Sequence, residues 1–264
     1  MHAASFPPKG LDMTFDLTSH GTAVLVTINR PEKRNALTLP QLGELAGILR
    51  GLGGDPDLTG LVLTGSGAFC AGADLKTIVE QGKQGPDGIQ DTIEEVPQQV
   101  VRALLDLPFP TVAALDGPAI GLGMDLALAC DSRLISSTGW MMQGWGRVGL
   151  IPGTGGELLL HERNPSILWR LLEDQPRIDA ELAERWGIGE GIEEHADAVA
   201  AALGRVERLS SLPRSALATY VTMYRSHLKS RLDEHLALCA QAQVALLTDA
   251  RFEANVGRVI PTSS

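Results

Sequence analysis

Short apolar runs alternate with stretches of helical spacing through the first part of the chain. The run TAVLVTI at 22–28 alternates between apolar and polar positions and is rich in β-branched residues, which predicts a strand. Shorter buried strands are predicted at TGLVLT (59–64), TVAAL (111–115) and RLIS (133–136). Helix-type patterns lie between these runs, and such an order is typical of an α/β fold.

Helices are predicted between the strands and through most of the chain after about residue 157. From Leu37 to Leu52 apolar residues recur at helical spacing, with Thr38 as a plausible N-cap and Pro40 in the first turn. Further helices are expected at 96–107, 121–129, 195–209 and 213–248. The last is long and amphipathic, as expected of a packing or oligomerising helix.

These patterns divide the chain into three parts. Residues 1–13 contain Pro7, Pro8 and Gly10 and are expected to form a loose tail. Residues 14–194 are expected to form an α/β core, and residues 195–264 a helical C-terminal region that holds subunits together. Within the core, residues 82–92 are polar and contain glycine, so we expect a mobile loop there.

Size and charge narrow the classes of protein. The chain has 264 residues, of which 44% are hydrophobic, enough to bury one substantial core. Its formal net charge of −10 argues against nucleic acid or an anionic membrane as a partner. A local basic pocket for a phosphorylated ligand is compatible with that charge.

Cysteine and histidine usage predicts neither a disulfide framework nor a metal site. Cys70, Cys130 and Cys239 lie far apart without a C-x-x-C pair, and the six His form no H-x-x-x-H pair. No apolar run approaches the ~20 residues that a membrane helix needs. The first residues lack both a signal core and an Arg-rich amphipathic stretch, so we expect a cytoplasmic location.

Two glycine-rich turns follow buried strands and lead into helices. They are GSGAFCAGAD at 65–74 and GPAIGLGMD at 117–125. The first backbone N–H groups of a helix are unpaired, and the helix dipole favours negative charge near them. Two such turns side by side would aim two N–H groups at one oxygen and form an oxyanion hole. Neither turn has the glycine spacing of a dinucleotide site or the G-K-[ST] ending of a phosphate loop.

Four segments resemble the signature segments of the crotonase, or enoyl-CoA hydratase/isomerase, superfamily. They are INRPEKRNALT (28–38), LVLTGSGAFCAGADLK (61–76), PTVAALDGPAIGLGMDLALACDSRLIS (110–136) and GLIPGTGG (149–156), in the family order. The resemblance implies an α/β fold in which ββα units repeat in a spiral, followed by a helical C-terminal region. It also implies homotrimers, often paired into a dimer of trimers.

The resemblance also implies roles for individual residues. The oxyanion hole falls on the N–H groups of Ala73 and Leu122. Arg34 would lie near the phosphates of coenzyme A, and Asp74 resembles a capping residue that orders its loop. The other implied substrate-binding positions are Ala36, Ala71, Gly72, Leu75, Lys76, Gly121, Trp145 and Gly149.

The chain departs from the hydratases of this family at both acid/base positions. The two hydratase glutamates fall here on Asp125 and Trp145. Asp is shorter than Glu by one C–C bond, about 1.5 Å, so Asp125 as a catalytic residue is not an equivalent replacement. Trp145 cannot ionise, but its ring can line an acyl pocket and its N–H can donate a hydrogen bond.

These features predict an acyl-CoA thioester enzyme, a lyase or isomerase with an altered acid/base set. Two alternatives stay open at this point: a non-catalytic acyl-CoA-binding protein, and a thioester decarboxylase or C–C hydrolase of the same superfamily. The expected partners are an acyl-CoA thioester and further copies of the chain. No separate cofactor is expected, because coenzyme A enters as part of the substrate.

Overall fold

The computed structural model describes residues 14–259, so the predicted tail at 1–13 lies outside the described residues. A six-stranded sheet has the order β1-β2-β3-β4-β6-β8. β1 and β2 form an antiparallel hairpin and the other pairs are parallel. The strands are β1 (Phe15–His20), β2 (Ala23–Ile28), β3 (Gly60–Gly65), β4 (Thr111–Leu115), β6 (Ser132–Ile135) and β8 (Glu190–Gly191).

The predicted strands are confirmed, and the structure adds β1, which the apolar pattern did not indicate. Its sequence FDLTSH is mostly exposed beyond Phe15, because β1 is an edge strand paired only with β2. A second, two-stranded parallel sheet pairs β5 (Pro118–Ile120) with β7 (Trp140–Met142). The chain passes from β4 into β5 of this small sheet, and β5 is part of the second glycine-rich turn, at 117–125.

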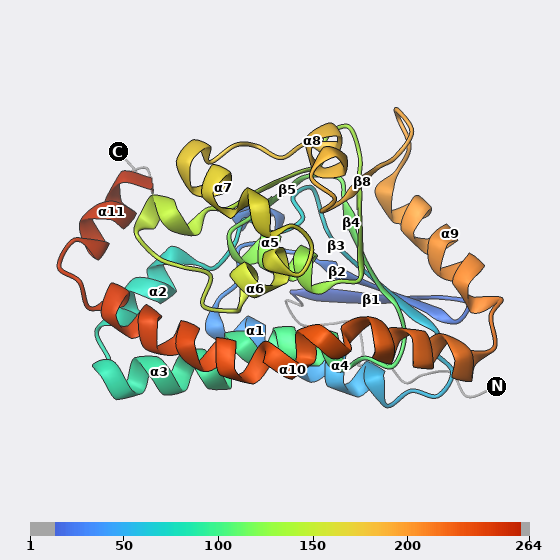
Figure 1. The fold of residues 1–264 in the computed structure, drawn as a ribbon, viewed down its shortest axis with the longest axis horizontal. Coiled ribbons are helices and arrows are strands. Elements are labelled where there is room, and N and C mark those ends of the chain that lie inside the picture. The colour runs from blue at the N-terminus through green and yellow to red at the C-terminus, as the bar shows by residue number, and fades with distance from the viewer. Residues whose placement is uncertain (1–13, 260–264) are drawn as a thin grey trace.

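Helices cover both faces of the large sheet (Figure 1). On one face Ala198, Ala202 and Val206 of α9 pack on the strands, and on the other the main core includes α1, α4 and α5. In the first half of the chain the helices are α1 (Leu39–Gly53), α2 (Leu75–Gly82), α3 (Pro86–Glu95), α4 (Pro97–Asp106) and α5 (Leu122–Ala129). They continue with α6 (Gly156–His161), α7 (Leu168–Asp174), α8 (Ala180–Arg185), α9 (Ala198–Ser210), α10 (Arg214–Leu247) and α11 (Phe252–Val259).

The start of α1 follows the sequence prediction. Thr38 is its N-cap, and Pro40 lies in the first turn. The Thr38 N–H donates to Gln41 Oε1 at 3.0 Å, which closes one half of a capping box. Short 3-10 turns complete the connections at η1 (Pro31–Lys33), η2 (Trp145–Val148) and η3 (Pro165–Ile167).

The prediction of a mobile loop at 82–92 is wrong. Most of this segment belongs to α3, and only a short turn separates α3 from α2. Ile89 and Ile93, four residues apart, are buried against the core, where α3 contacts α10. Packing of this narrow apolar stripe outweighs the low helix propensity of its polar and glycine positions.

The long helix α10 runs beside α3 and α4 in Figure 1. One stripe of it is buried, at positions three or four apart: Leu217, Val221, Arg225, Leu228, Leu232 and Leu236. The long helix predicted for 213–248 is therefore confirmed, and one stripe of it packs against the core. Among residues 14–259, no helix combines the length and the apolar character required to cross a bilayer.

Candidate functional site

The two glycine-rich turns, at 65–74 and 117–125, lie side by side. Cys70 N–H donates to Pro118 O at 3.1 Å, and Ile120 N–H donates to Cys70 O at 2.9 Å. Gly72 has φ +107°, and a Cβ atom there would lie 2.8 Å from Ile120 O and 3.7 Å from Leu122 N. Only glycine permits so close an approach in this backbone conformation. The turns predicted to act together are thus joined by hydrogen bonds.

Where the two turns meet, two backbone N–H groups of the described residues donate no hydrogen bond to the protein. Leu37 N–H donates to Gly72 O and Asp74 N–H donates to Leu37 O, so Ala73 N–H faces away from that pairing. Leu122 is the first residue of α5, and its N–H has no partner within the helix. Within the described range, neither Ala73 N–H nor Leu122 N–H donates to a protein acceptor.

Ala73 and Leu122 both line a cavity of about 680 Å³. Of the residues predicted to form the site, eight line this cavity: Arg34, Ala71, Gly72, Ala73, Leu75, Gly121, Leu122 and Trp145. Four predicted binding positions lie outside its wall, namely Ala36, Asp74, Lys76 and Gly149, and so does Asp125, the predicted catalytic residue. Sequence reasoning missed several of its residues, including Trp140, Met142, Gln175 and Arg177.

The four predicted binding positions outside the wall lie in segments next to it. Asp74 is the N-cap of α2 and accepts from Lys76 N–H at 3.1 Å, as the capping prediction expects. Ala36 O accepts from an Arg30 guanidinium N–H at 2.8 Å. Lys76 is exposed in the first turn of α2, and Gly149 ends η2 with φ +76°.

The cavity wall is positively charged although the chain is acidic. Arg34, Arg147 and Arg177 line it, and no Asp or Glu between residues 14 and 259 does. The Arg177 guanidinium lies 4.4 Å from the Trp140 ring centre, and Arg147 Nε donates to Gln175 Oε1 at 3.0 Å. A wall of this kind attracts an anionic ligand.

Asp125 lies one turn into α5 from Leu122, and 4% of its surface is exposed. Its Oδ2 accepts two hydrogen bonds, from Trp145 Nε1 at 2.9 Å and from Thr154 Oγ1 at 2.8 Å. Burial raises the pKa of this carboxyl to about 7, although the two donors oppose that rise. Asp125 therefore exchanges its proton near neutral pH. Sequence reasoning missed Thr154, whose only signal was its place in the fourth family segment.

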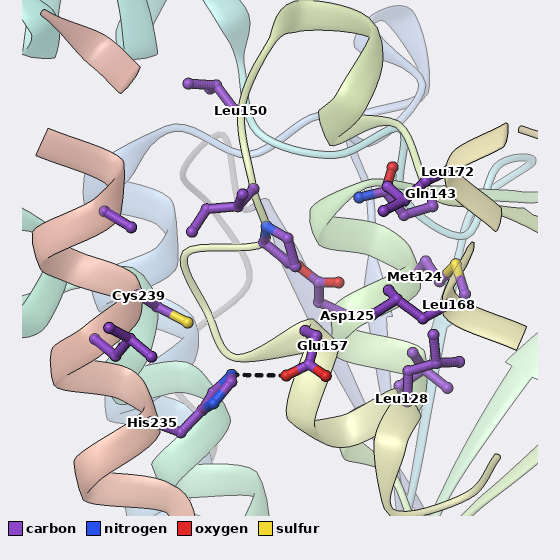
Figure 2. Close-up of a pocket in the computed structure, with 16 residues that line it drawn as sticks. Met124, Asp125, Leu128, Gln143, Leu150, Glu157, Leu168, Leu172, His235 and Cys239 are labelled. Carbon is purple, nitrogen blue, oxygen red and sulfur yellow. Dashed lines mark ion pairs between the residues drawn. The ribbon is translucent and has the colours of Figure 1, made fainter. Parts of the chain in front are cut away.

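Trp145 lies between the polar cavity and Asp125. Its side chain is buried, and its ring lies 3.7 Å from where a Cβ of Gly121 would be. Asp125 does not line the polar cavity with Trp145. It lines a second cavity, whose side chains are drawn in Figure 2. Asp125 and Trp145 are thus in direct contact but face different spaces.

This combination of a sheet, a helical C-terminal region and paired glycine turns defines a crotonase-type α/β protein. The family model for enoyl-CoA hydratase/isomerase matches residues 18–258. The chain belongs to the enoyl-CoA hydratase/isomerase family.

Individual relatives agree with this assignment. The chain is 33% identical over 218 residues to the Mycobacterium tuberculosis protein named "Probable enoyl-CoA hydratase EchA14", covering 79% of this chain and 80% of that one. It is 28% identical over 231 residues to a carnitinyl-CoA dehydratase of Proteus mirabilis, covering 85% of each chain. A solved enoyl-CoA hydratase/isomerase structure from Mycobacterium paratuberculosis superposes with a TM-score of 0.85 at 26% identity, covering 94% of this chain and 100% of that one.

Proposed function

We propose that this protein binds an acyl-CoA thioester in the polar cavity and polarises its carbonyl with the N–H groups of Ala73 and Leu122. The observation that carries the proposal is that Ala73 and Leu122 line one cavity and that, among residues 14–259, neither N–H has a protein acceptor. Donors held in place before the reaction stabilise the negative charge that develops on the thioester oxygen. The product of such polarisation is an enolate, formed when a proton leaves C-2 of the acyl group.

The charge of the cavity supports coenzyme A as the carrier. Arg34, Arg147 and Arg177 provide three guanidinium groups, which suit phosphate by charge and by geometry. The names of the relatives support the same ligand class, since they refer to enoyl-CoA and carnitinyl-CoA. Coenzyme A would then enter with the substrate and leave with the product.

Asp125 is the proposed proton carrier. Its pKa of about 7 suits a group that both takes and gives a proton at neutral pH. With Trp145 at the position of the second hydratase glutamate, we favour a proton transfer or isomerisation at the acyl chain over efficient addition of water.

One observation favours the alternative of an acyl-CoA-binding protein without catalysis. Oδ2 of Asp125 is occupied by Trp145 and Thr154, and the Trp145 ring lies between this carboxyl and the polar cavity. If that arrangement persists when the ligand binds, the carboxyl has no access to C-2. Binding and proton exchange must therefore be measured separately.

The test is deuterium exchange at C-2 of butyryl-CoA in D₂O, followed by mass spectrometry. The wild-type protein should speed the exchange, and Asp125→Ala should abolish it while binding persists. Leu122→Pro removes one N–H at the first helical position, where proline is tolerated, and should slow exchange by about 100- to 1000-fold.

Leu122→Ala is the matched control, because it keeps the N–H, and it should exchange at close to the wild-type rate. Circular dichroism establishes that each variant is folded. Binding without exchange in the wild type would favour the non-catalytic alternative. Absence of any binding of butyryl-CoA, by calorimetry or by thermal shift, would refute the proposal.

A further inference from the structure

Four ionisable side chains line the second cavity, which has a volume of about 390 Å³ and lies between α5, α6, α7 and α10 (Figure 2). They are Asp125, Glu157, His235 and Cys239. The rest of the wall is mainly aliphatic, so we call this space the aliphatic cavity. Leu238, which also lines it, is 61% exposed, so the cavity reaches the molecular surface.

The carboxyl of Asp125 is open to the aliphatic cavity and closed towards the polar one. Its Oδ2 accepts from Trp145 and Thr154, and the Trp145 ring lies between the carboxyl and the polar cavity. In the part of the chain described here, Oδ1 accepts no hydrogen bond, and a Cβ atom at Gly156 would lie 2.0 Å from it. A proton held by Asp125 therefore exchanges with solvent through the aliphatic cavity.

Glu157 and His235 form a pair on the wall of this cavity, close to Asp125. Glu157 Oε2 lies 3.4 Å from His235 Nε2, which makes no hydrogen bond within residues 14–259 and can bond a water molecule in the cavity. Gly156, which packs against Asp125, directly precedes Glu157, and a Cβ atom at Gly155 would lie 3.8 Å from His235 Cδ2. Two adjacent glycines thus contact the carboxyl and the imidazole.

The charge states of the pair suit the transfer of a proton at neutral pH. Burial lowers the pKa of His235, and the carboxylate of Glu157 opposes that fall. Arg231 and His161 lower the pKa of His235 further. Burial raises the pKa of Cys239, one turn along α10, to about 11, so this thiol stays neutral. His235 is therefore a neutral base near pH 7, and Glu157 stabilises the imidazolium that forms when it takes a proton.

We propose that His235 and Glu157 form a proton relay that connects Asp125 with solvent through the aliphatic cavity. This inference rests on the proposed function, because it takes Asp125 to remove the proton from C-2. As the C–H bond breaks, its electron pair stays on the thioester as the enolate, and the proton goes to Asp125. The proton then passes through water in the cavity to His235 and on to bulk solvent, and a solvent proton returns by the same route.

Deuterium exchange at C-2 of butyryl-CoA in D₂O tests the relay, because each exchange requires Asp125 to release its proton to solvent. Glu157→Gln and His235→Ala should each slow the exchange by roughly 100-fold, the lower end of what one acid/base group contributes. The affinity for butyryl-CoA, measured by calorimetry, should stay unchanged, because neither side chain lines the polar cavity.

Recovery by added imidazole separates a relay from a structural role. In His235→Ala, exchange should rise in proportion to the imidazole concentration, because the cavity reaches the surface and a small base can replace the missing ring. Glu162→Gln is the matched control. Glu162 directly follows α6 and pairs with Arg231 of α10 at 2.6 Å, but it does not line the aliphatic cavity. This variant should exchange at the wild-type rate.

Exchange at the wild-type rate in either Glu157→Gln or His235→Ala would overturn the inference and leave the proposed function intact. A loss of exchange that imidazole does not reverse would assign His235 a structural role and would also overturn it. Wild-type protein that binds butyryl-CoA without exchange at C-2 would overturn the relay together with the role of Asp125 as proton carrier.

Discussion

At the scale of single residues, Asp125 makes the stability of the protein depend on pH. Its pKa rises from an ordinary value of 3.8 to about 7 because the carboxyl is buried. Between these two values the folded state holds a proton that the unfolded state has released. The free energy of unfolding therefore falls as pH rises from about 4 to about 7, and this contribution is constant at higher pH.

The substitution Asp125→Asn should remove this fall in the free energy of unfolding, because an amide does not ionise. The amide oxygen can accept from Trp145 and Thr154 as Oδ2 does, and the amide nitrogen takes the place of the free oxygen. The variant should be more stable than the wild type by roughly 2–4 kcal/mol at pH 8 and nearly equal to it at pH 4. Urea unfolding across this pH range measures the difference. A constant difference between the two proteins would show that Asp125 does not titrate as described.

The contact between Asp125 and Trp145 leads to a second prediction. The wild-type protein should hydrate crotonyl-CoA poorly, because one carboxylate is left where the family's hydratases use two glutamates. The double substitution Asp125→Glu and Trp145→Glu should raise the turnover, since one acid/base group is worth roughly 100- to 10,000-fold.

Loss of the enoyl-thioester absorbance gives the rate, with kcat and KM determined separately. The control is Trp145→Glu alone, which leaves the shorter carboxylate in place and should gain less. A folded double variant that binds butyryl-CoA but hydrates no faster would mean that position 145 does not face the reacting carbons.

At the scale of elements, Arg225 attaches α10 to the core. It lies within the apolar stripe of that helix and is 2% exposed. Its guanidinium donates to Asp131 Oδ1 at 2.8 Å and to the carbonyl oxygens of Leu107, at 2.6 Å, and Phe109, at 3.1 Å. These carbonyls follow the end of α4, where no further turn of helix supplies N–H groups to donate to them.

Arg225→Met should destabilise the protein by about 3–5 kcal/mol, because it leaves Asp131 and these carbonyls without their buried donor. Arg231→Met, on the same helix, is the matched control. Arg231, whose side chain is half exposed, pairs with Glu162 near the surface, so its loss should cost about 0–1 kcal/mol. Urea denaturation compares the two variants. Equal midpoints would show that α10 is held by its apolar stripe alone.

At the scale of the whole molecule, α10 also presents apolar side chains to solvent. Tyr220, Met223 and Tyr224 are 66%, 64% and 60% exposed. Exposed aromatic residues gathered on one surface are typical of a surface that contacts another protein. We expect this surface of α10 to contact another copy of the chain.

Light scattering on a size-exclusion column should therefore give the mass of a trimer or a dimer of trimers. Tyr220→Glu with Tyr224→Glu should lower that mass, because two charges would be buried without partners. Lys229→Glu, which changes a charge elsewhere on α10, should leave the mass unchanged. A wild-type monomer would contradict both the expected assembly and the role predicted for residues 195–264.

The order of strands, turns and helices could be predicted from the sequence because each depends on neighbouring residues. β2, β3, β4 and β6 coincide with apolar runs, and Thr38 and Pro40 mark the start of α1. The glycine-rich turns were also evident, since their spacing and the family resemblance pointed to the same segments. That order of elements and the four family segments indicate the family from the sequence alone.

Other features depended on contacts between distant parts of the chain. α3 is a helix because Ile89 and Ile93 find a buried surface against the core, which its own polar sequence does not reveal. β1 forms a strand because its backbone pairs with that of β2. Arg177 lines the cavity because the fold places its guanidinium against the Trp140 ring. In each case the stabilising partner lies on another element.

The chemistry of the site shows the same division. The family resemblance predicted that Asp125 and Trp145 stand at the positions of the two hydratase glutamates, and the sequence located the two glycine turns. Only the tertiary structure decided that Trp145 and Thr154, 20 and 29 residues away, donate to one oxygen of Asp125. It also decided that the carboxyl is buried beside an aliphatic cavity. Burial and hydrogen bonding set the pKa and the accessible side of Asp125, and both arise from groups that folding brings together.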